Sequence, residues 1–190
     1  MADHTAERVG TVLPVFHDVV RRLAALPVPV LAAVQGAALG GGCELLLVCD
    51  LVLARDDARL GFPEIRLGVF PPVAVAVLEA IVGRRAAADL VLSGRTIGAD
   101  EARAMGLVSQ VLDADGFEAG VTARARELAS LSGPVLRIAK RVLRESARLP
   151  FDTALQRAES TYLEELMALP DASEGIAAFL EKRAPVWRDA

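Results

Sequence analysis

Aromatic residues, cysteines and histidines are scarce in this sequence. Phe, Trp and Tyr make up 4% of the 190 residues, so the core has to be built mostly from Ala, Val and Leu. The only cysteines, Cys43 and Cys49, lie in one apolar segment, and the only histidines are His4 and His17. These numbers argue against a zinc site, or any other metal site, and against a disulfide framework. We interpret the cysteines as small core residues in a reducing compartment.

An excess of positive charge and a long uninterrupted apolar run are also missing. The formal net charge is −4 and no basic block is present, which argues against nucleic acid as a partner. The apolar stretch Ala37–Leu53 contains three glycines, Glu44 and Asp50, and is too short to span a membrane. Residues 1–10 lack the basic and apolar regions of a secretory signal. We therefore expect a cytoplasmic protein without a membrane segment.

The hydrophobic periodicity predicts an α/β pattern in the first part of the chain. Thr5 can cap a helix whose apolar residues recur at helical spacing as far as Leu23, and Pro27 with Pro29 ends it. The apolar run Val28–Val34 predicts a buried parallel strand. The elements predicted next are a loop at Gly36–Gly42, a helix through Cys49, strands at Leu51–Ala54 and Arg59–Phe62, helices at Val73–Val82, Arg84–Leu92 and Asp100–Met105, and a strand at Leu107–Leu112.

The last third of the chain predicts helices only, at Phe117–Leu131, Pro134–Arg148, Phe151–Leu169 and Glu174–Lys182. We therefore divide the chain into a core at residues 1–115 and a helical region at residues 116–190. The helical region is rich in apolar residues for the end of a domain, which predicts that it packs on a neighbouring subunit. These residues include Leu163, Leu166, Met167, Ile176, Phe179 and Leu180.

A triple glycine, Gly40-Gly41-Gly42, stands between an apolar run and a predicted helix. Glycines there let a ligand approach the backbone, and the unpaired N–H groups of a helix N-terminus favour negative charge. The segment fits neither the phosphate loop G-x-x-x-x-G-K-[ST] nor the dinucleotide pattern G-x-G-x-x-G. An enolate-like oxyanion is the better candidate for the charge. A tight strand-to-helix turn without a ligand remains the alternative.

Two glutamates follow the glycines, twenty positions apart. Glu44 lies among leucines, where a carboxylate is costly unless it is paired or functional. Glu64 follows Pro63 at the end of a predicted strand, and a surface turn residue is its alternative reading. Two glutamates that face one cavity push their pKa values apart, so that one acts as a base while the other holds a proton.

Together these residues resemble the crotonase family, the enoyl-CoA hydratase/isomerase superfamily. The segment PVPVLAAVQGAALGGGCELLLVCDLVLARDDARLGFPEIRLGVFP is similar to the central signature of that family. GRTIGADEARAMGLVSQVL resembles the motif that follows it, and FLEKRAPVW resembles the family's C-terminus. The resemblance covers essentially the whole chain and implies a ββα spiral core followed by a helical oligomerisation region.

The resemblance also implies roles for individual residues. Gly41, next to Gly40, supplies a backbone N–H of the oxyanion hole that binds the acyl-CoA thioester oxygen. Glu44 and Glu64 hold a water molecule and move its protons to and from the double bond. Lys182 reaches the CoA of a neighbouring subunit. The implied partners are an acyl-CoA substrate and further copies of the chain in a trimer or hexamer. No metal or redox cofactor is implied, because CoA is part of the substrate.

Three departures from the family pattern stand out. The family's earlier strands are absent, and Met1-Ala2-Asp3 begins about where the segment with the second oxyanion donor should end. This predicts an N-terminally truncated chain that is nearly inactive by itself. Phe62 stands where the family often has Gln. Pro71-Pro72-Val73 replaces a glycine-rich loop and resembles members that act on cyclic dienoyl-CoA thioesters.

The sequence therefore predicts a lyase that reversibly hydrates an enoyl-CoA or dienoyl-CoA thioester. Double-bond isomerisation is the first alternative, because it needs one base and no bound water. A non-catalytic protein that keeps the fold without the full site is the second. The presence of both Glu44 and Glu64 favours hydration.

Overall fold

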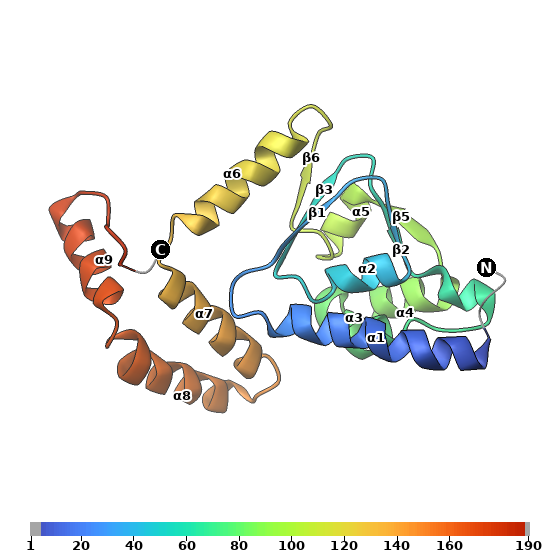
Figure 1. The fold of residues 1–190 in the computed structure, drawn as a ribbon, viewed down its shortest axis with the longest axis horizontal. Helices are drawn as coiled ribbons and strands as arrows, with labels where there is room; N and C mark the ends of the chain where they lie inside the picture. The colour runs from blue at the N-terminus through green and yellow to red at the C-terminus, as the bar shows by residue number, and fades with distance from the viewer. Residues whose placement is uncertain (1–4, 189–190) are drawn as a thin grey trace. The chain divides into compact units, whose positions relative to one another are not determined.

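The computed structural model describes residues 5–188 and divides the chain into two compact units (Figure 1). The first contains the residues up to Leu26 together with Val30–Val121, and the second contains Pro27–Pro29 and the residues from Thr122 onward. The predicted boundary between residues 115 and 116 differs from this division, and a role of the second part in trimerisation stays a prediction. His4 and the segment Met1-Ala2-Asp3 lie outside the described residues.

The first unit begins with the predicted helix, α1 (Ala6–Ala25). The hydroxyl of Thr5 caps it by accepting a hydrogen bond from the Arg8 N–H at 3.3 Å. The helix ends just before Pro27, as expected from the two prolines. Among its residues whose burial is described, Val20 alone is buried. Most of helix α1 is therefore exposed or half-buried.

Within residues 5–188 the strands form two three-stranded sheets. One has the order β1-β3-β6 and is parallel throughout; the other has the order β2-β4-β5, with β2 parallel and β5 antiparallel to β4. The pairs β1/β2 and β3/β4 each contribute one strand to each sheet, which is the ββα spiral expected from the sequence. The strands are β1 (Leu31–Val34), β2 (Ala37–Leu39), β3 (Leu51–Arg55), β4 (Arg59–Gly61), β5 (Thr96–Gly98) and β6 (Gln110–Leu112).

Several predicted elements around the glycines are shorter in the structure. Strand β1 begins at Leu31 rather than Val28, because the Asp50 carboxylate takes the Val30 N–H at 2.6 Å. The predicted glycine loop contains β2, which pairs with β4. Helix α2 (Gly41–Leu46) ends before Cys49, because the next N–H groups bond three residues back and tighten the turn.

The helices that follow agree with the sequence pattern, but one strand was not predicted. The segment continues as a 3₁₀ turn, η1 (Pro63–Leu67), and the helices α3 (Pro72–Val82), α4 (Arg84–Ser93) and α5 (Ala99–Ala104). Strand β5 was missed because three residues are too few for an alternation to be seen. The predicted strand Leu107–Leu112 is reduced to β6, because the N–H groups of Leu107 and Val108 both bond to the Ala102 carbonyl.

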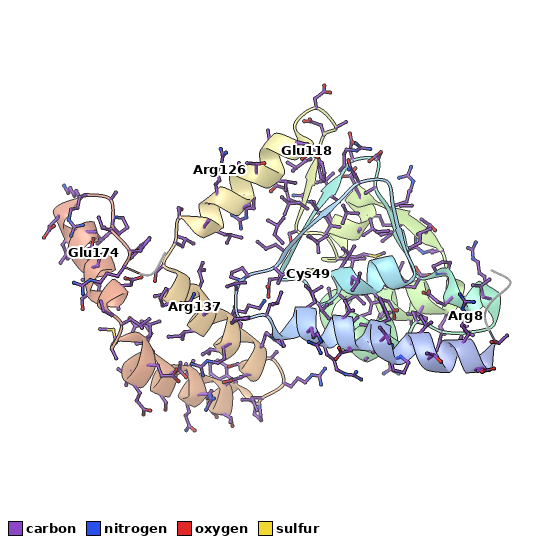
Figure 2. The ribbon with its side chains drawn as sticks, in the orientation of Figure 1. Arg8, Cys49, Glu118, Arg126, Arg137 and Glu174 are labelled. Carbon is purple, nitrogen blue, oxygen red and sulfur yellow. The ribbon has the colours of Figure 1, made fainter. Side chains whose placement is uncertain are left out.

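The core of the first unit consists mainly of small and aliphatic side chains. Cys43, Ala54, Leu60, Phe62 and Leu78 are among its fully buried members. The side chains of this unit are drawn in Figure 2, where Cys49 is labelled at the turn after α2; both cysteines are free. Among residues 5–188, no helix combines the length and the apolar character that crossing a membrane requires.

The second unit is helical, as predicted. It contains α7 (Gly133–Ser146), α8 (Phe151–Thr161), a π-helical turn η2 (Tyr162–Leu166) and α9 (Pro170–Glu181), while α6 (Phe117–Ala129) crosses the division between the units. The predicted helix Phe151–Leu169 is thus divided by η2, and α9 starts at Pro170 rather than at Glu174. A proline at the first helical position explains the earlier start, because its missing N–H costs nothing there.

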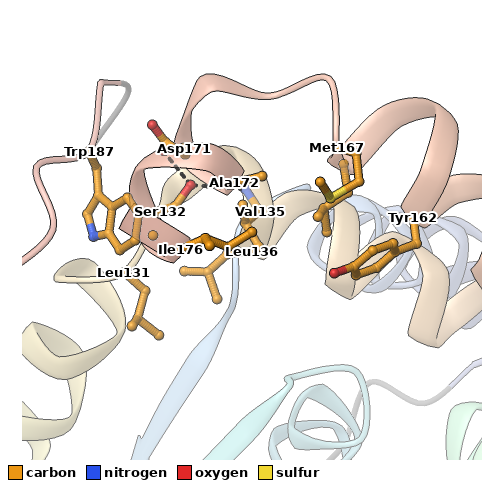
Figure 3. A pocket seen from close by; sticks show the side chains of 12 residues that line it. Leu131, Ser132, Val135, Leu136, Tyr162, Met167, Asp171, Ala172, Ile176 and Trp187 are labelled. Carbon is orange, nitrogen blue, oxygen red and sulfur yellow. Dashed lines mark hydrogen bonds between the residues drawn. The ribbon is translucent and has the colours of Figure 1, made fainter. Parts of the chain in front are cut away.

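The chain end folds back on α9. Glu174, labelled in Figure 2, accepts hydrogen bonds from the Arg183 guanidinium and from the Val186 N–H at 2.8 Å. Asp171 accepts from the Arg188 N–H, and the Trp187 indole donates to the Ser130 carbonyl at 2.8 Å. These contacts place Trp187 against a hollow of about 350 Å³ in the same unit (Figure 3). The hollow is mostly apolar, and Asp171 with its Ser132 partner is the polar part of its wall.

Candidate active site

The N-terminus of α2 carries backbone donors that the fold leaves unused. Gly40 precedes the helix with φ 56° and ψ −129°, and its N–H bonds to the Gly61 carbonyl at 2.9 Å. The first N–H bonded inside the helix is that of Glu44, which reaches the Gly40 carbonyl at 2.9 Å. In the part of the chain that the structure describes, the N–H of Gly41 therefore has no acceptor. It is the donor that the sequence singled out for an oxyanion.

Gly40 cannot donate its N–H to a ligand, because that group already bonds to the Gly61 carbonyl, so its role lies in the shape of the backbone. A Cβ at Gly40 would lie 2.7 Å from Glu64 Oε1, and the positive φ disfavours any side chain. Gly40 thus brings the backbone against the carboxyl of Glu64. Its predicted contribution to CoA binding stays a prediction.

Glu44 is buried and is held by the N-terminus of another helix. Its side chain is 3% exposed, and Oε1 accepts hydrogen bonds from the N–H groups of Val73 at 2.7 Å and Ala74 at 3.0 Å. A helix N-terminus and two N–H donors are complementary to a carboxylate, which accepts hydrogen bonds only. The cost expected for a carboxylate among leucines is offset by α3.

Glu64 has a different environment from Glu44. It lies in η1, which follows β4 directly and ends at Gly68 in the left-handed region with φ 76°. Its Oε2 atom is buried and has no hydrogen-bond partner among residues 5–188. Burial raises the pKa of the Glu64 carboxyl and the nearby charge of Glu44 raises it further, while a hydrogen bond from its own backbone N–H opposes them. A surface turn residue would not be buried in this way.

Cys43 lies within the electrostatic reach of both glutamates. It is 0% exposed, as expected for a core cysteine. Burial raises the pKa of its thiol to about 12; the Gly61 N–H opposes this shift, and the charges of Glu64 and Glu44 add to it. The thiol therefore stays protonated at neutral pH. Its interactions with Glu44 and Glu64 indicate that the two carboxyl groups converge on one region of the unit.

The structure thus brings together four of the five residues singled out from the sequence: Gly40, Gly41, Glu44 and Glu64. Lys182, the fifth, belongs to the second unit. It is exposed and ends α9 in the left-handed region, with φ 54°. Its contact with CoA stays a prediction. Among residues 5–188, no group of three or more His, Cys, Asp or Glu side chains is arranged to hold a metal ion.

Two features of the site were missed from the sequence. One is the pair of N–H donors at Val73 and Ala74, for which the double proline that opens α3 was the available signal. The other is Phe16, whose ring lies 3.3 Å from the position that a Cβ of Gly41 would take. Phe16 was counted only as one apolar position of α1. No local pattern relates it to a glycine 25 positions away.

The arrangement suits a reaction in which charge develops on a carbonyl oxygen while protons move nearby. The Gly41 N–H can stabilise an oxyanion. The Glu44 carboxyl group is anchored by two backbone N–H donors, whereas the Glu64 carboxyl group has a raised pKa and retains its proton more readily. Carboxyl groups with such different environments are typical of general acid–base pairs.

Comparisons with known proteins agree with this geometry. The sequence model of the enoyl-CoA hydratase/isomerase family matches residues 2–190. The chain is 41% identical to a cyclohexa-1,5-dienecarbonyl-CoA hydratase of Thauera aromatica, covering 98% of this chain and 72% of that protein. It is 42% identical to a 2,3-dehydroadipyl-CoA hydratase of Escherichia coli, covering 88% of this chain and 66% of that protein.

Solved structures show the same similarity. The fold superposes on an enoyl-CoA hydratase from Bacillus anthracis with a TM-score of 0.93 and 32% identity, covering 100% of this chain and 73% of that one. The human enoyl-CoA hydratase domain-containing protein 3 gives a TM-score of 0.90 at 34% identity, covering 96% of this chain and 74% of that one. The chain spans between 58% and 72% of the length of the curated relatives that it matches.

Proposed function

Because the chain belongs to the enoyl-CoA hydratase/isomerase family, we propose that it catalyses the reversible addition of water to an enoyl-CoA or dienoyl-CoA thioester. The observation that carries the proposal is the pairing of Glu44 with Glu64 beside the Gly41 N–H. The substrate itself brings CoA, and the proposal includes no separate cofactor. The two free cysteines fit a reducing compartment such as the cytoplasm.

The proposed reaction assigns one role to each group. The thioester oxygen accepts a hydrogen bond from the Gly41 N–H. Glu44, through Oε2, takes a proton from water as the water oxygen attacks the β-carbon, and the displaced electron pair moves to the thioester oxygen. Glu64 then gives its proton to the α-carbon. Proton exchange returns Glu64 to its acid form and Glu44 to its carboxylate form, so that one water molecule is added in total.

The buried Oε2 of Glu64 supports a bound water in this scheme. A buried acceptor without a protein partner is costly and usually has a water molecule or an ion as its partner. An isomerase needs only one base and gives no reason for a second carboxyl group with an unpaired atom. For this reason we place hydration ahead of double-bond isomerisation, and ahead of a non-catalytic role.

The first substrates that we propose to test are cyclic dienoyl-CoA thioesters. The relative from Thauera aromatica is named for such a substrate, and Pro71-Pro72 is the feature of this chain that departs from a glycine-rich loop. Linear enoyl-CoA thioesters form the second group. We propose an apolar acyl group in both cases, because Phe16 lies against the oxyanion donor.

The test is turnover in water enriched in ¹⁸O. A hydratase places the label in the product, whereas an isomerase changes the position of the double bond without taking up label. Glu64→Gln should lower the rate of label uptake by roughly 10²–10⁴-fold, the usual weight of general acid–base catalysis. Isomerised product without label would replace hydration by the first alternative. Binding of the thioester without any turnover would favour the second.

We also propose that the protein forms trimers or hexamers through its second unit. Exposed apolar side chains on α8, η2 and α9 support this, among them Phe151, Leu163, Phe179 and Leu180. Lys182 lies next to them along the chain and would serve the CoA site of a neighbour. Light scattering at micromolar concentration should detect the assembly. A stable monomer that still binds CoA tightly would overturn both parts of this proposal.

A further inference from the structure

The side chain of Phe16 reaches the N-terminus of α2 from a separate helix. Its Cζ atom lies 3.3 Å from the position that a Cβ of Gly41 would take, and its two Cε atoms lie 3.6 and 3.8 Å from that position. The ring therefore approaches end-on, with its outer edge toward Gly41. A side chain at residue 41 would need part of this space, so the glycine makes the contact possible.

An aromatic edge suits a place where negative charge develops. The π system of a phenyl ring is negative over its faces and positive at its edge. A ring face against Gly41 would compete for its N–H as a weak acceptor, whereas the edge leaves the N–H free. The edge also attracts an oxyanion bound to that donor. Phe16 thus covers the donor without occupying it.

The cover is limited to one side of the α2 N-terminus. Gly41 is half-buried, whereas Gly42 is exposed and a Cβ there would meet nothing within 4 Å. Both residues precede Glu44, whose N–H is the first that bonds inside the helix. The two glycines therefore differ in their surroundings rather than in their place in the ladder, and the ring of Phe16 is one cause of the difference.

We propose that Phe16 is a positioning residue that excludes water from the Gly41 N–H, so that this donor acts on the thioester oxygen at full strength. The inference rests on the proposed function. A donor stabilises an oxyanion more in a water-excluded site than in contact with solvent, because water screens the charge and competes for the N–H. Phe16 acts through Gly41 and takes no part in proton transfer.

The kinetic test replaces Phe16 and its neighbour on the same helix. Phe16→Ala removes the ring, and Val15→Ala shortens a side chain of α1 that is 64% exposed. Loss of a whole oxyanion donor costs roughly 10²–10³ in rate, so hydration of a donor that is retained should cost less, about tenfold in kcat. KM should stay within about threefold. Val15→Ala should leave both unchanged, and Phe16→Leu, which keeps an apolar cover, should lie between Phe16→Ala and the parent.

The carbonyl stretch of a bound thioester tests the donor without turnover. The probe is butyryl-CoA, a saturated thioester that cannot be hydrated, with ¹³C at its carbonyl. The hydrogen bond from Gly41 should lower the stretching frequency in the parent, and Phe16→Ala should lose much of that shift. A parental kcat or a parental carbonyl shift in Phe16→Ala overturns the inference.

A structural role alone would give a different pattern. The unfolding free energy and the active fraction would fall, while the carbonyl shift and the kcat of the folded molecules would stay parental. If Phe16→Ala does not fold, Phe16→Leu decides the question by the same two measurements.

A double-mutant cycle tests the contact independently of activity. Gly41→Ala places a Cβ 3.3 Å from Phe16 Cζ, so the ring has to shift, whereas in Phe16→Ala the same Cβ has room. The double variant should therefore lose less unfolding free energy than the two single variants together. Additive losses would refute the contact. A parent that binds no acyl-CoA thioester would refute the proposed function and this inference with it, while the cycle would still measure the contact.

Discussion

Replacement of Glu44 separates its structural role from its proposed catalytic role, because the two N–H donors of α3 depend on one of its oxygens. Glu44→Gln keeps an oxygen that can accept from Val73 and Ala74, whereas Glu44→Ala leaves both N–H groups without their acceptor. Each buried N–H left without a partner costs about 1–3 kcal/mol, so Glu44→Ala should lose about 2–6 kcal/mol of unfolding free energy. Glu44→Gln exchanges two charge-assisted hydrogen bonds for neutral ones, which costs about 2 kcal/mol or less.

Activity should not follow the same order. Neither variant has a carboxylate to take the proton from water, so both should lose roughly 10²–10⁴-fold in kcat, which corresponds to about 3–5 kcal/mol in the activation barrier. Urea unfolding with an unchanged slope gives the stability of each variant, and the hydration assay gives its turnover. A Glu44→Ala protein as stable as the parent would refute the contact with α3. A Glu44→Gln protein with parental turnover would refute the role as base.

Three further predictions concern single groups. Folding raises the pKa of Glu64 above its ordinary value of 4.5, so its contribution to stability is fully present below that value and is lost as pH rises through the folded pKa. In urea titrations, Glu64→Gln should therefore gain stability relative to the parent between about pH 4 and about pH 8. An equal difference in unfolding free energy between variant and parent at the two pH values would contradict this. Gly40→Ala should lower both stability and turnover, because its Cβ would lie 2.7 Å from Glu64 Oε1. Gly42→Ala, whose Cβ meets nothing within 4 Å, should keep the free energy of unfolding unchanged or raise it by up to about 1 kcal/mol. The pKa of Glu174 is lowered to about 2 by its hydrogen bonds with Arg183 and the Val186 N–H, so the contacts of the chain end persist above pH 4.5 and are lost as pH falls through about 2. The fluorescence of Trp187 should shift to longer wavelength over that pH range, and Glu174→Gln should show the same shift at neutral pH. A Glu174→Gln protein with parental fluorescence would show that the chain end is held without this carboxylate.

The parts of the fold that the sequence predicted were mostly marked by helix-breaking residues. Prolines marked where α1 ends and where α3 begins, and the lone carboxylate in a leucine run identified Glu44 because burial of an unpaired charge is costly. Strands β2 and β5 were not predicted, because three residues pair only through neighbours that are distant in sequence. Local pattern does not contain that information.

The candidate site was predictable to a similar degree. Gly41, Glu44 and Glu64 could be singled out by residue type and position, but their partners could not. The anchor of Glu44 lies 29 and 30 positions away, and the ring beside Gly41 comes from a different helix. The raised pKa of Glu64 also depends on the burial of its carboxyl group in the folded chain. These are tertiary properties, and only the folded chain determines them.

The bond between Gly40 and Gly61 has a consequence for how such a site can evolve. It continues the pairing of β2 with β4, so that the proposed oxyanion donor at Gly41 and the proposed acid at Glu64 are both attached to one pair of strands. The distance between Gly41 and Glu64 therefore tends to be conserved, because a mutation that displaces one of the two residues also displaces the other. Phe16 reaches the same place from α1, a helix with little burial of its own. Natural variation or directed evolution can therefore remodel α1 to accept a new acyl group while the reacting atoms keep their distances.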